Sequence, residues 1–423
     1  MFYNIKKRYL SEVPKDTRYN FIRDCIGNVY SGIFAGLYSP FLAIVGRKYF
    51  HLSPLQLSLL LAGGFMAGVL GMLVASFVPV NKENTYMAYM GFLGCAFIIL
   101  MSPLLNYSQS KLYTCMCLAY YVCASFGPLY QVIIQRIYRY EVRAKLLGYS
   151  KSLGAFAAIV FTALAGLFIE KQYLGFDLWR LSFVLGALAC CGNMYFCFYK
   201  IKMPKMDIQR DNPLKFLGQS FSLLKTDRLN TLLIVVGFFY TAAYMITNTL
   251  VPIYQNDVLK IGPKEVAVLT LIQNIGWTVG YPIMGKYITA KGPVKGLIMT
   301  CILGIIMTVS YILCPGSWKF LLIFYIFFGM FLSGNDMAWM NILLYIAPAE
   351  KSTEYQSLNY FFIAIRGFVG AAGATWIIGY AENICPEKEI ISLFYKGVFG
   401  VSVIAFVIAI VLTVFIFRKK TKF

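Results

Sequence analysis

The feature that constrains this chain most is a series of long apolar segments separated by short stretches of Pro, Gly and charged residues. A helix needs roughly 20 apolar residues to cross the hydrocarbon core of a bilayer. Twelve segments approach or exceed that length: 22–45, 53–78, 85–103, 112–137, 147–169, 178–199, 229–251, 264–288, 294–314, 319–346, 356–380 and 393–417. The sequence therefore predicts an all-α membrane protein with about twelve transmembrane helices.

Composition supports a lipid environment. Hydrophobic residues make up 59% of the 423 positions and charged residues only 13%, whereas soluble domains carry roughly 25% charged residues. Twelve spans would use about 240 residues, which leaves room for short loops and for no large soluble domain. We expect the lipid bilayer to be the main partner of the protein surface.

The basic residues predict the orientation of the chain. The net charge of +20 would suggest nucleic-acid binding in a soluble protein, but here the basic residues lie in short loops. With both termini in the cytoplasm, 27 of the 38 Lys and Arg residues fall on the cytoplasmic side and 10 on the other. This bias follows the positive-inside rule. We expect an integral protein of the plasma (inner) membrane with both termini cytoplasmic, and no nucleic-acid partner.

The longest loop divides the chain into two halves. Residues 200–228 are basic and contain Pro204 and Pro213, which indicates a cytoplasmic linker. We predict an N-terminal six-helix bundle over 1–199, the linker over 200–228 and a C-terminal six-helix bundle over 229–423.

A weak internal repeat relates the two halves. LYSPFL closes the first span and TLVPIY closes the seventh, and LSPLQLSLL and IGPKEVAVL open the spans that follow. In this register, Ala67 and Gly71 of the first half correspond to Gly276 and Gly280 of the second half. Small residues at these positions would let helices pack closely in lipid. Two pseudo-symmetric bundles of this kind favour a binding site between them, near the midplane of the membrane.

Two loops carry a resemblance to a known family. YRYEVRAKLLGYSKSLG, from Tyr138 to Gly154, is similar to the basic loop that leads into the fifth helix of major facilitator transporters, and APAEKSTEYQSL is its counterpart in the second half. With the six-plus-six layout, the chain resembles the major facilitator superfamily over nearly its whole length. The loop GMLVASFVPVNKENTY departs from the family pattern, because it lacks the usual Asp and has Lys82 as its single basic residue. The resemblance implies a secondary active transporter that moves a small organic solute by alternating access.

Two ionisable residues lie deep inside predicted spans. Asp336 and Arg366 each lie about ten residues from the cytoplasmic end of their span, which places both roughly 15 Å deep. An ionisable residue inside a membrane is a functional candidate by default. Arg366 could contact an anionic substrate group and Asp336 could carry a coupling proton. Equally, the two could form a structural ion pair between neighbouring helices.

Further candidates come from the helices that line the central cavity in the family, together with polar residues at helical spacing. The predicted substrate-binding or coupling residues are Asp336, Arg366, Asn28, Gln131, Tyr240, Tyr244, Asn248, Gln273, Trp277 and Trp339. Basic residues near the predicted cytoplasmic surface form a candidate gate: Arg136, Arg139, Arg143 and Lys286. The alternative for these basic residues is a role in topology and contact with lipid headgroups.

Two other classes of function are compatible with a chain of many transmembrane helices. A membrane-embedded lipid-modifying enzyme usually needs a His or carboxylate cluster, but the single histidine, His51, has no acidic residue nearby in the sequence. We therefore expect no enzyme activity, no catalytic residue, no metal site and no cofactor. A non-transporting receptor or assembly protein on a transporter fold stays open as an alternative. The expected partner is a small-molecule substrate, with protons as a candidate coupling ion, and we expect a monomer because such carriers keep the pathway within one chain.

Overall fold

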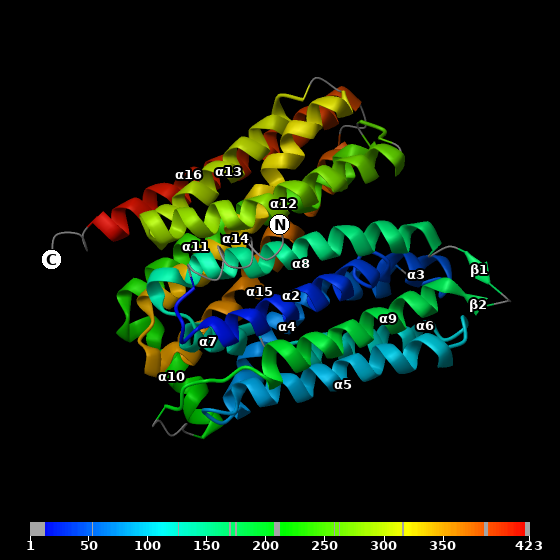
Figure 1. Cartoon of the computed structure of the whole chain (residues 1–423). Helices are drawn as coiled ribbons and strands as arrows, with labels where there is room; N and C mark the ends of the chain where they lie inside the picture. The colour runs from blue at the N-terminus through cyan, green and yellow to red at the C-terminus, as the bar shows by residue number, and fades with distance from the viewer. Residues whose placement is uncertain are drawn as a thin grey trace, which may run out of the picture. The chain divides into compact units, whose positions relative to one another are not determined.

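The computed structural model describes residues 13–52, 54–125, 127–168, 171–173, 176–206, 212–257, 259–261, 263–314, 317–384 and 388–418. These residues are almost wholly helical, and one short antiparallel hairpin joins β1 (Gln172–Tyr173) to β2 (Phe176–Asp177) (Figure 1). The chain separates into two compact units. Unit 1 contains Met1–Leu217 with Ala349–Tyr360, and unit 2 contains Gly218–Pro348 with Phe361–Phe423.

Unit 1 is a helical bundle in which α2 packs against both α8 and α9, as Figure 1 shows. Helix α5 packs against α6 and α9, and α4 packs against α6. The last turn before the linker is a π-helix, Met194–Tyr199. The helices of this unit are α2 (Arg18–Leu37), α3 (Leu42–Lys48), α4 (Pro54–Phe77), α5 (Glu83–Leu104), α6 (Ser110–Cys123), α7 (Gly127–Ile137), α8 (Tyr140–Phe168) and α9 (Leu178–Asn193).

Unit 2 repeats much of this packing. Helix α14 packs against α12 and α13, and α16 packs against α11 and α13. The helices are α11 (Arg228–Asp257), α12 (Pro263–Lys291), α13 (Pro293–Ile312), α14 (Leu321–Ile346) and α16 (Lys388–Arg418), together with the part of α15 (Ser352–Ile384) from Phe361 onward, since the first turns of α15 belong to unit 1. Helix α10 (Pro213–Thr226) connects the units along the chain, and two short 3-10 turns cover Trp318–Phe320 and Ala349–Lys351.

The internal repeat is visible in these neighbours. The predicted spans can be numbered 1 to 6 within each half. In both units, spans 2 and 3 pack on span 4, and spans 1 and 3 pack on span 6. Since lipid supplies no hydrophobic drive between helices, close packing carries much of the association. These four pairs of neighbours recur in both units, as the internal repeat predicts.

Small residues make these contacts close, as the repeat predicted. A Cβ at Gly280 would lie 3.1 Å from the Cα of Met330 on α14, and one at Gly276 would meet the backbone of Ile326. In unit 1, a Cβ at Gly71 would lie 3.1 Å from the carbonyl oxygen of Ser125. The predicted close-packing role of these glycines is confirmed, while the side chain of Ala67 lies outside the described residues.

Two predicted spans are broken helices. The segment 22–45 was expected as one helix, but α2 ends at Leu37 and α3 begins at Leu42, with Pro40 in the turn between them. Proline removes a backbone donor and clashes with the preceding turn, so the helix stops there. The predicted span 112–137 is likewise divided into α6 and α7, and Pro128 lies in the first turn of α7, where proline is tolerated.

Eight of the predicted spans are long and apolar enough to cross a membrane when only the described residues are considered. They are Glu83–Leu104, Ser110–Ile137, Tyr140–Leu167, Leu178–Tyr199, Arg228–Val251, Pro293–Ile312, Trp318–Ile346 and Ser392–Arg418. The other four predicted spans coincide with α2 and α3, α4, α12 and α15. The all-α membrane fold predicted from the sequence is therefore confirmed.

Candidate functional site

A carboxylate near the middle of α14 is the centre of a polar chain in unit 2. The hydroxyl of Tyr281 on α12 donates a hydrogen bond to Oδ2 of Asp336 at 2.6 Å. The amide of Asn335 donates to Oδ1 of Asp336 at 3.4 Å and accepts from the hydroxyl of Tyr240 on α11 at 2.9 Å. Asp336 is half-buried, so three helices fix the position of a carboxylate that can still accept a further hydrogen bond.

Aromatic rings form the wall beside this polar chain. Tyr240 is buried, and its ring centroid lies 5.2 Å from that of Trp339. The ring of Tyr244, one helical turn further along α11, lies 5.3 Å from Phe331. The predicted residues Tyr240, Tyr244 and Trp339 therefore lie together with Asp336 in one cluster of unit 2.

The predicted residues on α12 and at the end of α11 have different surroundings. The Trp277 ring lies 5.9 Å from Tyr281, and its indole Nε1 is buried without an acceptor among the described residues. Gln273, one turn before it, is half-buried, and its backbone carbonyl lies against Gly329. Asn248 is exposed near the end of α11. Trp277 thus adjoins the cluster through Tyr281. Gln273 lies one turn before Trp277 on α12, and Asn248 lies one turn after Tyr244 on α11.

Arg366 is buried in unit 2, with 2% of its surface exposed. Its guanidinium lies 5.4 Å from the centroid of the Trp339 ring, and Nη1 donates to the carbonyl oxygen of Ile234 at 3.4 Å. Gly237 on α11 makes room for the guanidinium, because a Cβ there would lie 2.7 Å from Cζ of Arg366. The sequence left open an ion pair with Asp336. The structure places Arg366 on Trp339 and the α11 backbone instead, while Asp336 takes the partners described above.

Unit 1 contains a second carboxylate, which the sequence analysis did not select. Asp24 on α2 is fully buried and accepts a hydrogen bond from the hydroxyl of Tyr138 at 2.8 Å. The amide of Asn28 donates to Oδ1 of Asp24 at 3.0 Å, and the thiol of Cys197 lies 3.5 Å from the same oxygen. Each unit thus holds one carboxylate bonded to a tyrosine hydroxyl and an asparagine amide.

Two predicted residues of unit 1 find partners in this structure. Asn28 serves Asp24, as described. Gln131 on α7 is buried, and its Nε2 donates to the hydroxyl of Tyr360 at 3.1 Å. The Oε1 of Gln131 is buried without a donor among the described residues, so this amide keeps one acceptor for a further group.

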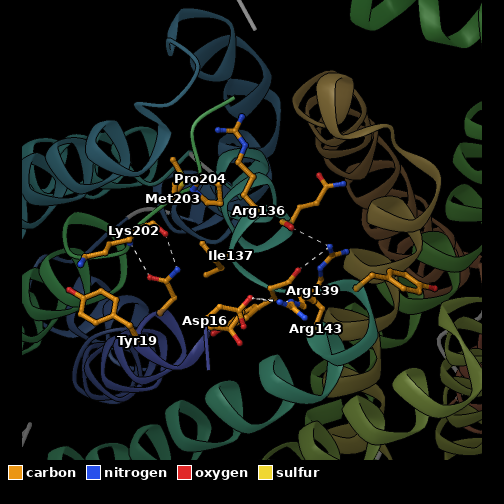
Figure 2. A pocket seen from close by; sticks show the side chains of 14 residues that line it. Asp16, Tyr19, Arg136, Ile137, Arg139, Arg143, Lys202, Met203 and Pro204 are labelled. Carbon is orange, nitrogen blue, oxygen red and sulfur yellow. Dashed lines mark hydrogen bonds and ion pairs between the residues drawn. The ribbon is translucent and has the colours of Figure 1, made fainter. Parts of the chain in front are cut away.

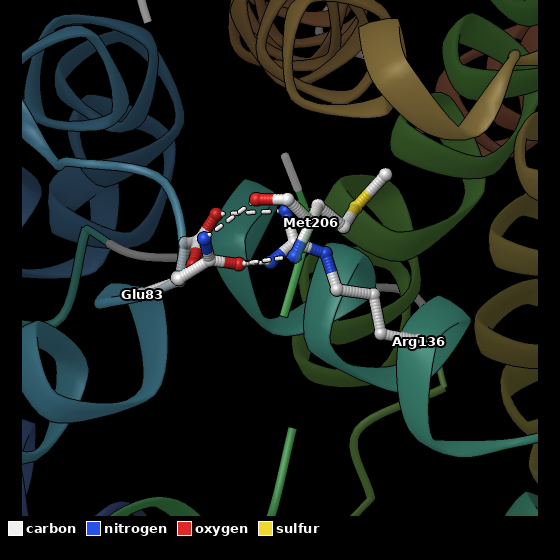
Figure 3. A network of polar contacts seen from close by, with 4 residues as sticks. Glu83, Arg136 and Met206 are labelled. Carbon is white, nitrogen blue, oxygen red and sulfur yellow. Dashed lines mark hydrogen bonds and ion pairs between the residues drawn. The ribbon is translucent and has the colours of Figure 1, made fainter. Parts of the chain in front are cut away.

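Arg136, predicted as part of a gate, belongs to a network at one end of unit 1 (Figure 3). Its Nη2 lies 3.0 Å from Oε1 of Glu83, and the Glu83 side chain is fully buried. Oδ1 of Asn81 accepts a hydrogen bond from Nη1 of Arg136 at 3.5 Å and another from the backbone N–H of Met206 at 2.8 Å. The network therefore joins the end of α7, the start of α5 and the linker.

The other predicted gate residues are placed separately. Figure 2 shows the guanidinium of Arg139 directed at the carboxylate of Asp16, and the closest N–O distance is 2.7 Å on an exposed surface. Arg143 is buried and donates to two backbone carbonyls near the end of α7, each at 3.3 Å. Lys286 is exposed on α12 in unit 2. Within unit 1, each of the three arginines has partners in its own unit.

The described residues contain no group of three or more His, Cys, Asp or Glu side chains placed to hold a metal ion. The polar cluster of unit 2 offers phenol, amide, indole and carboxylate groups. Such groups can bind a polar solute by hydrogen bonds and can transfer a proton.

Comparisons with known proteins identify the family. The sequence profile of the Major Facilitator Superfamily matches residues 25–371 and, in a second match, residues 257–422. The chain therefore belongs to the major facilitator superfamily and is an integral membrane transporter with the two-bundle fold of that family. Comparison with curated proteins finds no sequence match.

Solved structures share the fold at low sequence identity. The fucose:proton symporter FucP of E. coli is 12% identical with a TM-score of 0.66, over 93% of this chain and 99% of that one. The human organic anion transporter MFSD10 is 10% identical with a TM-score of 0.67, over 93% and 100%. The proton:xylose symporter XylE is 9% identical with a TM-score of 0.64, over 94% of both chains. At such identities the likeness concerns the fold alone.

Proposed function

We propose that the protein is a secondary active transporter that moves a small polar organic solute by alternating access within a single chain. The observation that carries this proposal is the carboxylate of Asp336 in the middle of a 26-residue apolar helix, held by a tyrosine hydroxyl and an amide. A charged side chain inside the membrane is energetically costly, and such residues usually have a functional role. Movement of one unit against the other would expose such a group to each side in turn.

In this proposal Asp336 exchanges a proton during the cycle. The Tyr281 hydroxyl holds the carboxylate in place by a hydrogen bond at 2.6 Å, and the half-buried position of Asp336 leaves it open to solvent or solute. Asp24 is the second candidate for this role, but it is fully buried beneath Tyr138 and Asn28. We assign the coupling role to Asp336 because a coupling group must meet the solute or the water beside it.

The solute proposed for this site is neutral and carries several hydroxyl groups. The indole Nε1 of Trp277 lacks an acceptor among the described residues, and the carboxylate of Asp336 accepts hydrogen bonds. The ring of Tyr244, which is half-buried, can cover the apolar side of a sugar ring. The guanidinium of Arg366 lies over the Trp339 ring, which disfavours a direct bond to an anionic solute. Two of the structurally similar proteins are described as symporters of fucose and xylose, and these supply the first solutes to test.

The test begins with the stability of the purified protein against a panel of sugars, amino acids, carboxylates and nucleosides. A ligand that binds the folded state raises its stability, by about 2.7 kcal/mol at 100 times its Kd. Each stabilising ligand is then used in radiolabelled counterflow with proteoliposomes. The proposal expects a hydroxyl-rich neutral solute to pass both steps, and Trp277→Phe to weaken its binding. A solute that binds but never exchanges would favour a non-transporting receptor, and stabilisation by carboxylates alone would overturn the assigned substrate class.

A further inference from the structure

A cavity of about 540 Å³ opens at the end of unit 1 where α2 begins (Figure 2). Three segments far apart in the sequence form its wall: the start of α2, the turn between α7 and α8, and the linker at 202–204. Its volume is within the range of small-molecule sites, about 300–1,000 Å³. None of the residues assigned to solute binding in unit 2 lines it, so it is separate from the proposed transport site.

The charge around this cavity is mainly positive. Four cationic side chains line it, Arg136, Arg139, Arg143 and Lys202, against one carboxylate, Asp16. Arg136 is paired with a glutamate outside the lining and Arg139 with Asp16. Arg143 donates to backbone carbonyls, and the ammonium of Lys202 lies over an aromatic ring at 4.8 Å. Arg143 and Lys202 therefore have no carboxylate partner among the described residues.

Buried donors at the cavity also lack acceptors. Arg143 is 5% exposed and Arg136 has a side chain 10% exposed, yet the Nε–H of each is buried without an acceptor among the described residues. An unpaired buried donor destabilises the fold, and guanidinium groups are suited to carboxylate and phosphate oxygens. The lining thus contains guanidinium groups whose hydrogen-bonding capacity is not fully used, which favours an anionic ligand in the cavity.

Two helix N-termini add to the positive electrostatic potential of the cavity. Helix α2 begins at Arg18 directly after Thr17, which lines the cavity and makes no side-chain cap to the first turn. Helix α8 begins at Tyr140, another lining residue. The first backbone N–H groups of a helix have no intrahelical acceptor and carry a partial positive charge. Both helix starts therefore favour an anion in the space between them.

The wall formed by the linker is held in place before any ligand arrives. Nδ2 of Asn20 donates to the carbonyl oxygen of Lys202 at 2.8 Å, and Oδ1 of Asn20 accepts from the backbone N–H of Lys202 at 3.0 Å. The hydroxyl of Tyr19 donates a hydrogen bond to the carbonyl oxygen of Lys200, with a distance of 3.2 Å. A ligand would thus enter a preorganised site, which lowers the entropy cost of binding.

We propose that this cavity binds a ligand through a phosphate group. A phosphate suits the site better than a single carboxylate, because its several oxygens and double charge can meet more than one cation and the helix starts at once. The phosphate could belong to a soluble metabolite or to a lipid headgroup, since the cavity lies at the end of the bundle that the sequence predicts to be cytoplasmic. The test below separates these two sources.

The experiment measures binding of glycerol 3-phosphate to the full-length purified protein in detergent, by isothermal calorimetry and by thermal stability. Sodium chloride at equal ionic strength and uncharged glycerol are the controls. The lipid arm compares thermal stability in phosphatidylcholine nanodiscs with and without phosphatidic acid, whose headgroup is the same glycerol phosphate. Binding in detergent supports a soluble ligand, and stabilisation by phosphatidic acid alone supports a lipid.

The linker offers a matched pair of variants. Lys202 lines the cavity, whereas Lys205, three residues further on, is exposed and does not. Lys202→Gln is expected to weaken binding up to about fivefold, as is Arg139→Gln, since each removes one exposed charge contact. Lys205→Gln should bind as the wild type does.

Both lining variants remove exposed charges, so unfolding should not mask the result, and thermal unfolding without ligand checks this. The proposal is overturned if chloride at equal ionic strength stabilises the protein as much as the phosphate probes do. It is also overturned if Lys202→Gln and Lys205→Gln weaken binding equally, because the effect would then be general surface charge.

Discussion

Gly237→Ala is the sharpest probe of the position of Arg366. A Cβ at residue 237 would lie 2.7 Å from Cζ and 3.1 Å from Nη2 of Arg366, well inside ordinary van der Waals contact at about 3.5–4.0 Å. The guanidinium would have to move off the Trp339 ring and away from the carbonyl of Ile234.

The expected loss of unfolding free energy follows from three contributions. Overpacking a buried site costs about 1–3 kcal/mol, and the lost cation–π contact adds up to about 2 kcal/mol. Replacing a helical glycine by alanine returns about 0.5–1 kcal/mol. Taking the middle of each range, we expect the variant to lose about 2 kcal/mol of unfolding free energy, measured by thermal and denaturant unfolding in detergent.

Gly400→Ala on α16 is the matched control, because a Cβ at residue 400 meets nothing within 4 Å. It should be neutral or slightly stabilising. In the Arg366→Gln background the shorter side chain leaves space, so the cost of Gly237→Ala should fall by at least about 1 kcal/mol. If Gly237→Ala is no more costly than Gly400→Ala, the described packing of Arg366 on α11 is wrong.

Three further outcomes follow from described contacts. Arg136→Gln should cost about 3–5 kcal/mol, because it leaves the buried carboxylate of Glu83 without its partner; adding Glu83→Gln should recover much of the loss in thermal unfolding, and a larger loss in the double variant would argue against a buried pair. Asn81→Gly keeps the positive φ of residue 81 but removes two hydrogen bonds to the backbone of Met206, so trypsin should cleave the linker about tenfold faster, and an unchanged rate would argue against this attachment. Gly280→Leu should prevent the close approach of α12 to α14 and abolish folded protein in size-exclusion chromatography, whereas a monodisperse variant would contradict that packing.

Much of the fold could be predicted from the sequence because its causes are local. The length of an apolar segment determines whether it can form a transmembrane helix. Small residues at a repeated spacing allow the close helix contacts at Gly276 and Gly280. The breaks at Pro40 and before Pro128 were present in the sequence as helix-stopping residues. They were missed because hydrophobicity continues across both breaks.

The candidate site was harder to predict because its partners are set by tertiary packing. Asp24 is the third residue of the predicted first span and was not among the predicted site residues, although Tyr138, 114 positions later, bonds to it in the interior. Arg136 was singled out for its spacing, but its partner Glu83 lies 53 positions away at the start of another helix. No local pattern encodes either pairing. The single available signal was an acidic residue close to an apolar segment.

Proton-coupled accumulation by proteoliposomes tests the central claim most directly. A solute identified in the binding screen is offered to vesicles with an imposed proton gradient, and wild type is compared with Asp336→Asn. The account predicts that the wild type accumulates the solute against its gradient, and that Asp336→Asn still exchanges labelled for unlabelled solute but no longer accumulates it. Accumulation by Asp336→Asn equal to that of the wild type would contradict the coupling role assigned to this carboxylate.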